Sequence, residues 1–289
     1  LSAMRRARDV SVVAYTLRPG RLEDALVAAA RRGAHVRLRL EGQPYKDTAG
    51  ELQANNAQAI AALRAAGADA REVDVPGSHE APLHAKAVVA DAAVFLDDRN
   101  WADDGEETIV RDDFSTDRRA AIDAVNGKGD NANRCFSIRQ RDALASEARL
   151  LYHARRGDDV IVESESFGAY NRVFRALESA ARNGARPRLL VSARDLQGNV
   201  RERAALARLA GDGVRVRTTG ADEKFALAAR RGWIGSANAS AALHHPDQLD
   251  WGLRTDQRHV IAHLRGVFET RWKNALPLTA ETGPARSDR

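Results

Sequence analysis

The 289-residue sequence contains one cysteine, Cys135, and few aromatic side chains. A single cysteine excludes both an internal disulfide and a zinc cluster built from thiolates. Aromatic residues make up only 5% of the chain, which disfavours a surface that stacks nucleic-acid bases on rings. No stretch approaches the roughly 18 consecutive apolar residues of a membrane span. With 44% hydrophobic and 29% charged residues, the chain is expected to be soluble and globular.

Lysine is scarce as well. The sequence has 45 basic and 40 acidic residues, and the resulting net charge of +5 favours anionic partners such as phosphates, nucleic acid or lipid headgroups. Nearly all of these bases are arginine, so a lysine marks a place where a compact point charge is needed. The five lysines are Lys46, Lys86, Lys128, Lys224 and Lys273.

The order of strand-like and helix-like segments in the first half recurs in the second half. Segments 159–166, 175–193 and 205–217 repeat the patterns of 9–17, 24–42 and 61–73, and 250–256 aligns with 107–113. Matches in the same order indicate an internal duplication. Repeated βα units predict an α/β fold with two pseudo-repeated lobes, each a mixed β-sheet flanked by helices.

The stretch 126–134 is rich in glycine and asparagine, and we interpret it as the linker between the lobes. The predicted lobes are therefore residues 1–128 and residues 129–289. Ligand sites in duplicated folds often lie where the halves meet, so we expect one site at the lobe interface. The sequence begins with Leu1 rather than methionine, which suggests trimming; the compartment (secreted, periplasmic or cytoplasmic) stays open.

The segment LHAKAVVAD, residues 83–91, carries a histidine and a lysine before an apolar run. Side chains alternate along a strand, so His84 and Lys86 are expected on the same face. There they can share an anion, which the lysine neutralises while an imidazole nitrogen attacks it. Asn100 is expected to donate an amide hydrogen to the same anion, and Glu107 to hold the imidazole in one tautomer.

The second half contains an altered copy of this segment. Lys224 stands where the repeat predicts a counterpart of Lys86, and Asp250 stands in the place of Glu107. Two of the five lysines therefore fall at repeat-equivalent positions. The remaining candidates of this copy, which we expect to bind the anion or to let backbone approach it, are Gly235, Ser236 and Asn238.

These residues resemble the phospholipase D superfamily, the HKD enzymes. His84, Lys86 and Asp91 fit its His-x-Lys-x4-Asp motif, and residues 235–238 fit its Gly-Ser-x-Asn motif. The resemblance implies cleavage or transfer of a phosphodiester without metal or other cofactor, through a phosphohistidine on His84. It also implies that phosphoryl oxygens are bound by a set of donors: Lys86, Lys224, Asn100 and Asn238, with Ser236 assisting.

The second copy departs from the family pattern. Asp222 replaces the second histidine and Ala229 the second aspartate, while Asp97 and Asp98 replace Gly-Ser in the first copy. Three explanations stay open. In the first, a carboxyl (Asp222 or Glu223) or an imidazole (His244 or His245) is the general acid. In the second, two chains pair and each supplies its His84. In the third, the protein binds phosphodiesters without turnover.

The sequence thus predicts a phosphodiesterase whose expected catalytic set is His84, Lys86, Asp91, Glu107, Asp222, Lys224 and Asp250. The favoured substrate is a phospholipid headgroup phosphodiester, because the resemblance favours it for two-lobed chains. A nuclease acting on DNA or RNA is the alternative that the positive charge suggests, and a non-catalytic phosphate-binding module is the third. We expect a monomer with two lobes, with a homodimer as the alternative.

Overall fold

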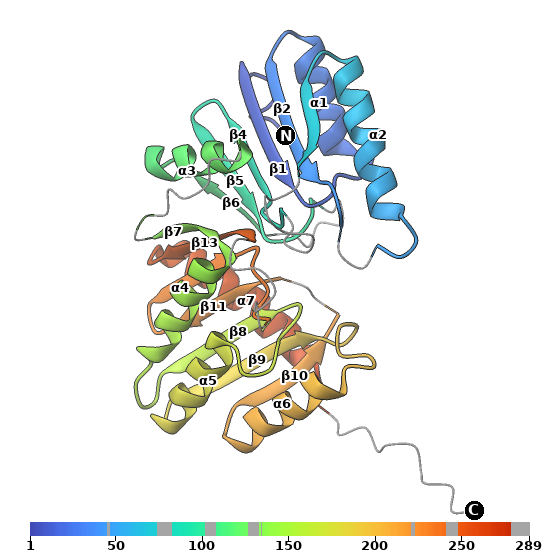
Figure 1. Cartoon of the computed structure of the whole chain (residues 1–289). Helices are drawn as coiled ribbons and strands as arrows, with labels where there is room; N and C mark the ends of the chain where they lie inside the picture. Colours follow the sequence, from blue (N-terminus) through green and yellow to red (C-terminus); the bar gives the residue numbers. More distant parts are fainter. Residues whose placement is uncertain are drawn as a thin grey trace, which may run out of the picture. The chain divides into compact units, whose positions relative to one another are not determined.

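The structure is a computed structural model that describes residues 1–44, 47–73, 83–101, 108–126, 133, 135–220, 223–240 and 248–278. Two mixed sheets flanked by helices account for the described chain, which confirms the predicted α/β class (Figure 1). None of the helices in these ranges combines the length and the apolar character needed to cross a bilayer.

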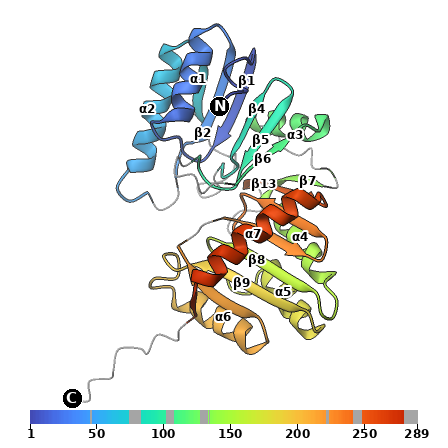
Figure 2. The ribbon, with the colours of Figure 1, turned by 180° about the vertical axis from the view of Figure 1, so that it is seen from behind.

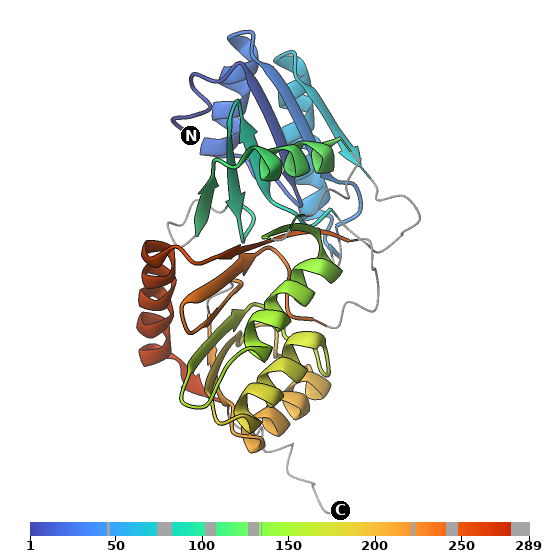
Figure 3. The same ribbon diagram turned by 90° about the vertical axis from the view of Figure 1, so that its left-hand side faces the viewer.

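The first sheet has six strands in the order β3-β2-β1-β4-β5-β6. Its strands are β1 (Asp9–Ala14), β2 (His35–Glu41), β3 (Asp69–Val73), β4 (Ala87–Ala90), β5 (Ala93–Asp97) and β6 (Ile109–Asp112). Strands β1 to β3 are parallel, whereas β4 to β6 join antiparallel. Figure 3 shows α1 (Arg21–Arg31) and α2 (Glu51–Ala65) on one face of this sheet and α3 (Ser115–Val125) on the other.

Burial of alternating apolar side chains holds this sheet and its helices together. Val12, Leu38 and Leu26 are fully buried on β1, β2 and α1, and each such side chain contributes roughly 1.5–3 kcal/mol when taken out of water. Gly33 ends α1: it has φ +90°, a left-handed conformation that a side chain would oppose.

The second sheet has eight strands in the order β14-β10-β9-β8-β11-β12-β13-β7. Its strands are β7 (Phe136–Arg139), β8 (Asp159–Ser164), β9 (Arg186–Ser192), β10 (Arg215–Thr219), β11 (Phe225–Ala228), β12 (Arg231–Gly235), β13 (Leu249–Thr255) and β14 (Leu276–Pro277). Its helices are α4 (Gln140–Tyr152), α5 (Arg172–Arg182), α6 (Val200–Gly211) and α7 (Arg258–Asn274). Figures 2 and 3 show α7 on one face, opposite α5 and α6.

The topology confirms the internal repeat. The order β10-β9-β8-β11-β12-β13 is the order β3-β2-β1-β4-β5-β6 of the first sheet. Val13 pairs with Ala87 between β1 and β4, and Glu163 pairs with Phe225 between β8 and β11. Each lysine therefore directly precedes an equivalent strand. The turns that follow these strands agree, because Asp91 and Ala229 have φ angles of 50° and 53°.

The chain forms two compact units that do not follow a single cut in the sequence. Unit 1 comprises 1–147, 233–237 and 242–255, and unit 2 comprises 148–232, 238–241 and 256–289. Part of the second repeat, including Ser236 and Asp250, therefore belongs to the unit that holds His84. The predicted lobe boundary between residues 128 and 129 falls outside the described residues and stays a prediction.

Candidate active site

The segment that carries His84 is fixed to strand β13. Leu83 forms an isolated parallel bridge with Leu249, and the His84 backbone N–H donates to the Leu249 carbonyl oxygen at 2.9 Å. On the other side of the segment, the Leu83 N–H donates to the buried carboxylate of Glu41 at the end of β2, at 2.5 Å. The backbone next to His84 is thus held from two elements.

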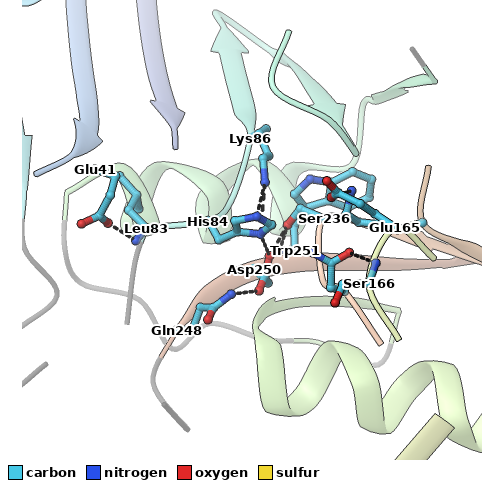
Figure 4. Close-up of polar contacts among 12 residues, drawn as sticks. Glu41, Leu83, His84, Lys86, Glu165, Ser166, Ser236, Gln248, Asp250 and Trp251 are labelled. Atoms are coloured by element: carbon cyan, nitrogen blue, oxygen red, sulfur yellow. Dashed lines mark hydrogen bonds and ion pairs between the residues drawn. The ribbon is translucent and has the colours of Figure 1, made fainter. Parts of the chain in front are cut away.

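Asp250 orients the His84 imidazole. Nδ1 of His84 lies 2.8 Å from Asp250 Oδ1, and the carboxylate is fully buried (Figure 4). Ser236 Oγ donates to the same oxygen at 2.7 Å, and Gln248 Nε2 donates to Oδ2 at 2.7 Å. An imidazole that donates from Nδ1 carries its lone pair on Nε2, so the side chain is set up as a nucleophile or base at that atom.

The charge of Asp250 depends on the bases beside it. Burial raises the pKa of this carboxyl, but His84 and Lys86 and the hydrogen bond from Ser236 act in the opposite direction, and the net result is a lowered pKa. The group is therefore ionised at neutral pH and stabilises positive charge on the imidazole. Because the folded-state pKa is depressed, its contribution to stability is present above the ordinary carboxyl pKa and is lost as pH falls below it.

Lys86 lies beside the His84 imidazole. Its ammonium nitrogen is 3.0 Å from His84 Nε2 and 3.1 Å from Nδ1, and the side chain is almost completely buried. The Tyr15 ring, at the end of β1, packs edge-on against the imidazole with centroids 5.4 Å apart and lies 5.9 Å from the ammonium. An anion that approaches Nε2 therefore meets a fixed positive charge next to an aromatic wall.

Gly235 and Ser236 act on Asp250 through the packing of their strand. A side-chain carbon on Gly235 would lie 2.5 Å from the Trp251 carbonyl oxygen, so only glycine allows this approach. The Ser236 hydroxyl is fully buried and accepts from the Trp251 N–H at 3.0 Å while it donates to Asp250. The geometry thus lets these two residues position Asp250, and their expected part in binding the anion stays a prediction.

Asp91 is involved in the turn after β4 and not with His84. Its Oδ1 accepts from the backbone N–H groups of Arg8 and Asp9, both at 3.0 Å, and the four residues of β4 separate it from Lys86. The contacts that the structure shows for Asp91 fix the turn. The catalytic role expected from the motif stays a prediction.

The carboxylates that replace Gly-Ser in the first copy are buried. Asp97 and Asp98 are both fully buried, and Asp97 accepts from the Trp101 N–H at 2.6 Å. The Asp97 carbonyl oxygen also accepts from Trp251 Nε1 at 2.8 Å. Asn100, the expected amide donor, lies nearby in sequence and is partly buried.

The candidates of unit 2 contact other charged or polar groups. Lys224 is buried with its ammonium nitrogen 3.1 Å from Glu165 Oε2. Glu223, one of the candidate general acids, forms an ion pair with Arg271 at 3.0 Å. Asn238 accepts a hydrogen bond from the Ser166 N–H at 3.3 Å. The remaining candidates, Glu107, Asp222, His244 and His245, lie outside the described residues.

Sequence reasoning missed four residues of these surroundings. Gln248 precedes Asp250 by two positions, a spacing that could have placed both on one face of β13. Tyr15 and Glu165 follow equivalent strands, β1 and β8, so the repeat alignment could have matched them. Nothing in the sequence marked Glu41 as a buried acceptor. An acid is common at the end of a strand in which charged and apolar residues alternate. Within the described ranges, no three metal-ligating side chains cluster together.

No protein-family model matches the sequence, and no curated protein matches it. Solved structures do. A polyphosphate kinase from Porphyromonas gingivalis aligns with 100% of this chain at 13% identity and a TM-score of 0.65, and the chain spans 50% of that protein's length. The phosphatidylserine synthase from Haemophilus influenzae Rd KW20 aligns with 96% of this chain and 83% of its own, at 10% identity and a TM-score of 0.70.

The chain therefore shares an α/β fold with two mixed sheets with these two structures over nearly its whole length. At these identities the likeness establishes the fold alone.

Proposed function

We propose that the chain is a metal-independent phosphodiesterase of phospholipase D type, in which His84 is the nucleophile. The observation that supports this most directly is the contact of 2.8 Å between His84 Nδ1 and the ionised carboxylate of Asp250. This contact leaves the lone pair on Nε2 and stabilises the imidazolium that forms when Nε2 bonds to phosphorus. It is the orienting arrangement that activates an imidazole for covalent catalysis.

The reaction would proceed in two displacements. Nε2 attacks phosphorus, a P–N bond forms, and the P–O bond to the leaving alcohol breaks while a general acid protonates that oxygen. The deprotonated general acid then takes a proton from water or an acceptor alcohol, the oxygen of that molecule bonds to phosphorus, and the P–N bond breaks with its electrons returning to Nε2. Lys86, with its ammonium 3.0 Å from Nε2, offsets the charge on the phosphoryl oxygens in both steps.

The general acid is proposed among Asp222, His244 and His245. Glu223 is a weaker candidate, because its carboxylate forms an ion pair with the Arg271 guanidinium at 3.0 Å. The prediction that Lys224 and Asn238 bind the same phosphoryl group as His84 stays a prediction, as does the role of Glu107.

For the substrate we propose a phospholipid headgroup phosphodiester. The likeness to a phosphatidylserine synthase, which extends over 96% of the chain, supports a lipid substrate. The net charge of +5 supports the alternative, a nuclease.

The test is a transfer assay with labelled phosphatidylcholine and ethanol, combined with intact-mass analysis after brief exposure and alkaline quenching. We expect phosphatidylethanol and a phosphatidyl adduct that is absent from His84→Gln. Cleavage of single-stranded DNA without lipid transfer would replace the lipid substrate by a nucleic acid. If neither substrate reacts and His84→Gln still binds phosphate, the chain is a binding module and the catalytic proposal fails.

A further inference from the structure

Helices α5 and α6 of unit 2 expose charge of a single sign. Their exposed charged residues, which we call the α5–α6 surface, are Arg172, Arg175 and Arg182 on α5 and Arg201 and Arg208 on α6. The acids of these helices, Glu178 and Glu202, are buried. Glu178 pairs with Arg208 at 3.0 Å, so the two helices lie side by side (Figure 1). Among the described residues, the other four arginines form no ion pair.

The equivalent helices of the first repeat expose both signs of charge. On α1 and α2, the exposed charged residues are Arg21, Asp24, Arg31, Glu51 and Arg64. Interspersed charges of opposite sign weaken the electrostatic potential over a surface, whereas charges of one sign add to it. Since the same α/β unit folds with either arrangement, the fold itself does not demand the arginines of the α5–α6 surface.

Two of these arginines lie where a helix disfavours positive charge. Arg172 is the first residue of α5 and Arg201 is the second residue of α6. The N-terminal end of a helix carries a partial positive charge, so acids stabilise this end and bases oppose it. The first turn of α5 has no acid, whereas the first turn of α1 has Glu23 and Asp24. Helix stability therefore does not explain these arginines, but an external anion does.

Apolar side chains are exposed at the same edge of the sheet. Val200, the first residue of α6, is 75% exposed, and Tyr170, two residues before α5, is 48% exposed. Strands β8 and β9 are parallel and each leads to its helix, so both helices begin at the carboxyl ends of these strands. The guanidinium of Arg208 lies 5.3 Å from the centre of the Tyr170 ring. Arginines and exposed apolar side chains are thus neighbours on this surface.

We propose that the α5–α6 surface docks the chain on a membrane that contains anionic lipids, with Val200 and Tyr170 entering the headgroup region. Clustered arginines are attracted to the negative charge of such a membrane. Apolar side chains leave water when they enter the interface, whereas the phosphate backbone of a nucleic acid offers an exposed valine no such gain. The choice of a lipid surface rests on the phospholipid substrate proposed above, but docking requires no reaction at His84.

The test measures binding of the full chain to vesicles by co-sedimentation. The vesicles are phosphatidylcholine with about one third phosphatidylglycerol, which supplies the negative charge, or phosphatidylcholine alone. Every protein carries His84→Gln, so that no lipid is consumed. We expect the parent chain to bind the anionic vesicles and to release them at high salt, which screens the attraction. Replacing Arg172, Arg175 and Arg201 by glutamine should weaken binding about 100-fold, which is about fivefold for each arginine.

A matched triple variant shows whether position matters. Replacing Arg21, Arg31 and Arg64 of α1 and α2 by glutamine removes the same net charge from exposed positions and should weaken binding less than about threefold. Val200→Ser should weaken binding about threefold at any salt concentration, because it reduces only the apolar contact. Circular dichroism identifies the folded variants. If the α5–α6 triple variant does not fold, Arg175→Glu alone decides, and it should weaken vesicle binding about tenfold or more.

Three outcomes would overturn the proposal. They are equal binding of the parent chain to both kinds of vesicle, equal losses in the two triple variants, and unchanged vesicle binding in a folded α5–α6 variant that loses affinity for duplex DNA. The last outcome would assign the surface to a nucleic acid. Because binding is measured without turnover, a chain that docks but fails the transfer assay would disprove the proposed reaction and leave the docking surface in place.

Discussion

Lys86 is preceded by a histidine and faces an aromatic ring, whereas Lys224 is preceded by Asp222 and Glu223 and contacts a carboxylate. Both are almost fully buried and occupy equivalent positions of the repeat. The two copies of the motif thus keep the lysine, whereas the side chain that contacts its ammonium differs between them. In the first repeat the ammonium contacts the imidazole of His84, whereas in the second it contacts the carboxylate of Glu165.

At one position of the strand register, the second repeat has an ion pair where the first has an apolar side chain. Glu163 occupies the position of Val13 in the strand register, and its carboxylate pairs with Arg271. Replacing an apolar residue by a buried acid is tolerated only with a bound counter-charge. In unit 2, buried acids and bases at these positions are thus paired with one another.

The largest effect that we predict from comparing the two repeats is a difference in turnover between variants of the two lysines. Lys86→Met should lower phosphodiester turnover about 1,000-fold, since it removes a charge that contacts the reacting group. Lys224→Met should lower turnover less than about tenfold, because this lysine is already neutralised by Glu165. Steady-state turnover of both variants with the lipid substrate measures the difference.

Urea denaturation of both lysine variants is the control. Lys224→Met is expected to lower the free energy of unfolding, because it leaves Glu165 without the ammonium of Lys224. Equal losses of turnover in two folded variants would contradict the comparison. They would instead favour the sequence-based prediction that Lys224 binds the substrate phosphoryl group.

The second prediction places in the first repeat what the second repeat has, a carboxylate next to the lysine. Tyr15→Glu should place a carboxylate beside Lys86 and reduce turnover about 100-fold, because the ammonium would then pair with the side chain rather than with substrate. Tyr15→Gln removes the ring without adding charge and should be distinctly more active. Comparable activity of the two variants in the transfer assay would show that charge at this position is irrelevant.

The fold could be predicted well from the sequence, because hydrophobic periodicity and terminal glycines such as Gly33 are local features. Equivalence of Lys86 and Lys224 was also accessible, since it needs only an alignment of the chain with itself. The contact between His84 and Asp250, 166 residues away, was not accessible in this way. The role of Glu107, the orienting carboxylate that the sequence suggested, stays a prediction because this residue lies outside the described ranges. An alignment identifies equivalent carboxylates but does not tell which one reaches the ring.

The smallest predicted effect concerns Gly235, whose counterpart in the first repeat is the buried Asp97. Gly235→Ala should lower the free energy of unfolding by about 1–3 kcal/mol, because the added carbon overpacks the contact with Trp251. That carbon would lie 2.5 Å from a backbone oxygen, which cannot yield as a flexible side chain would. Gly211→Ala, where an added carbon meets nothing within 4 Å, is the control for urea denaturation and should show no loss. If the two alanine variants are equally stable, the close approach of β12 to β13 does not restrict this position. In that case the repeats differ at positions 97 and 235 for a reason other than packing.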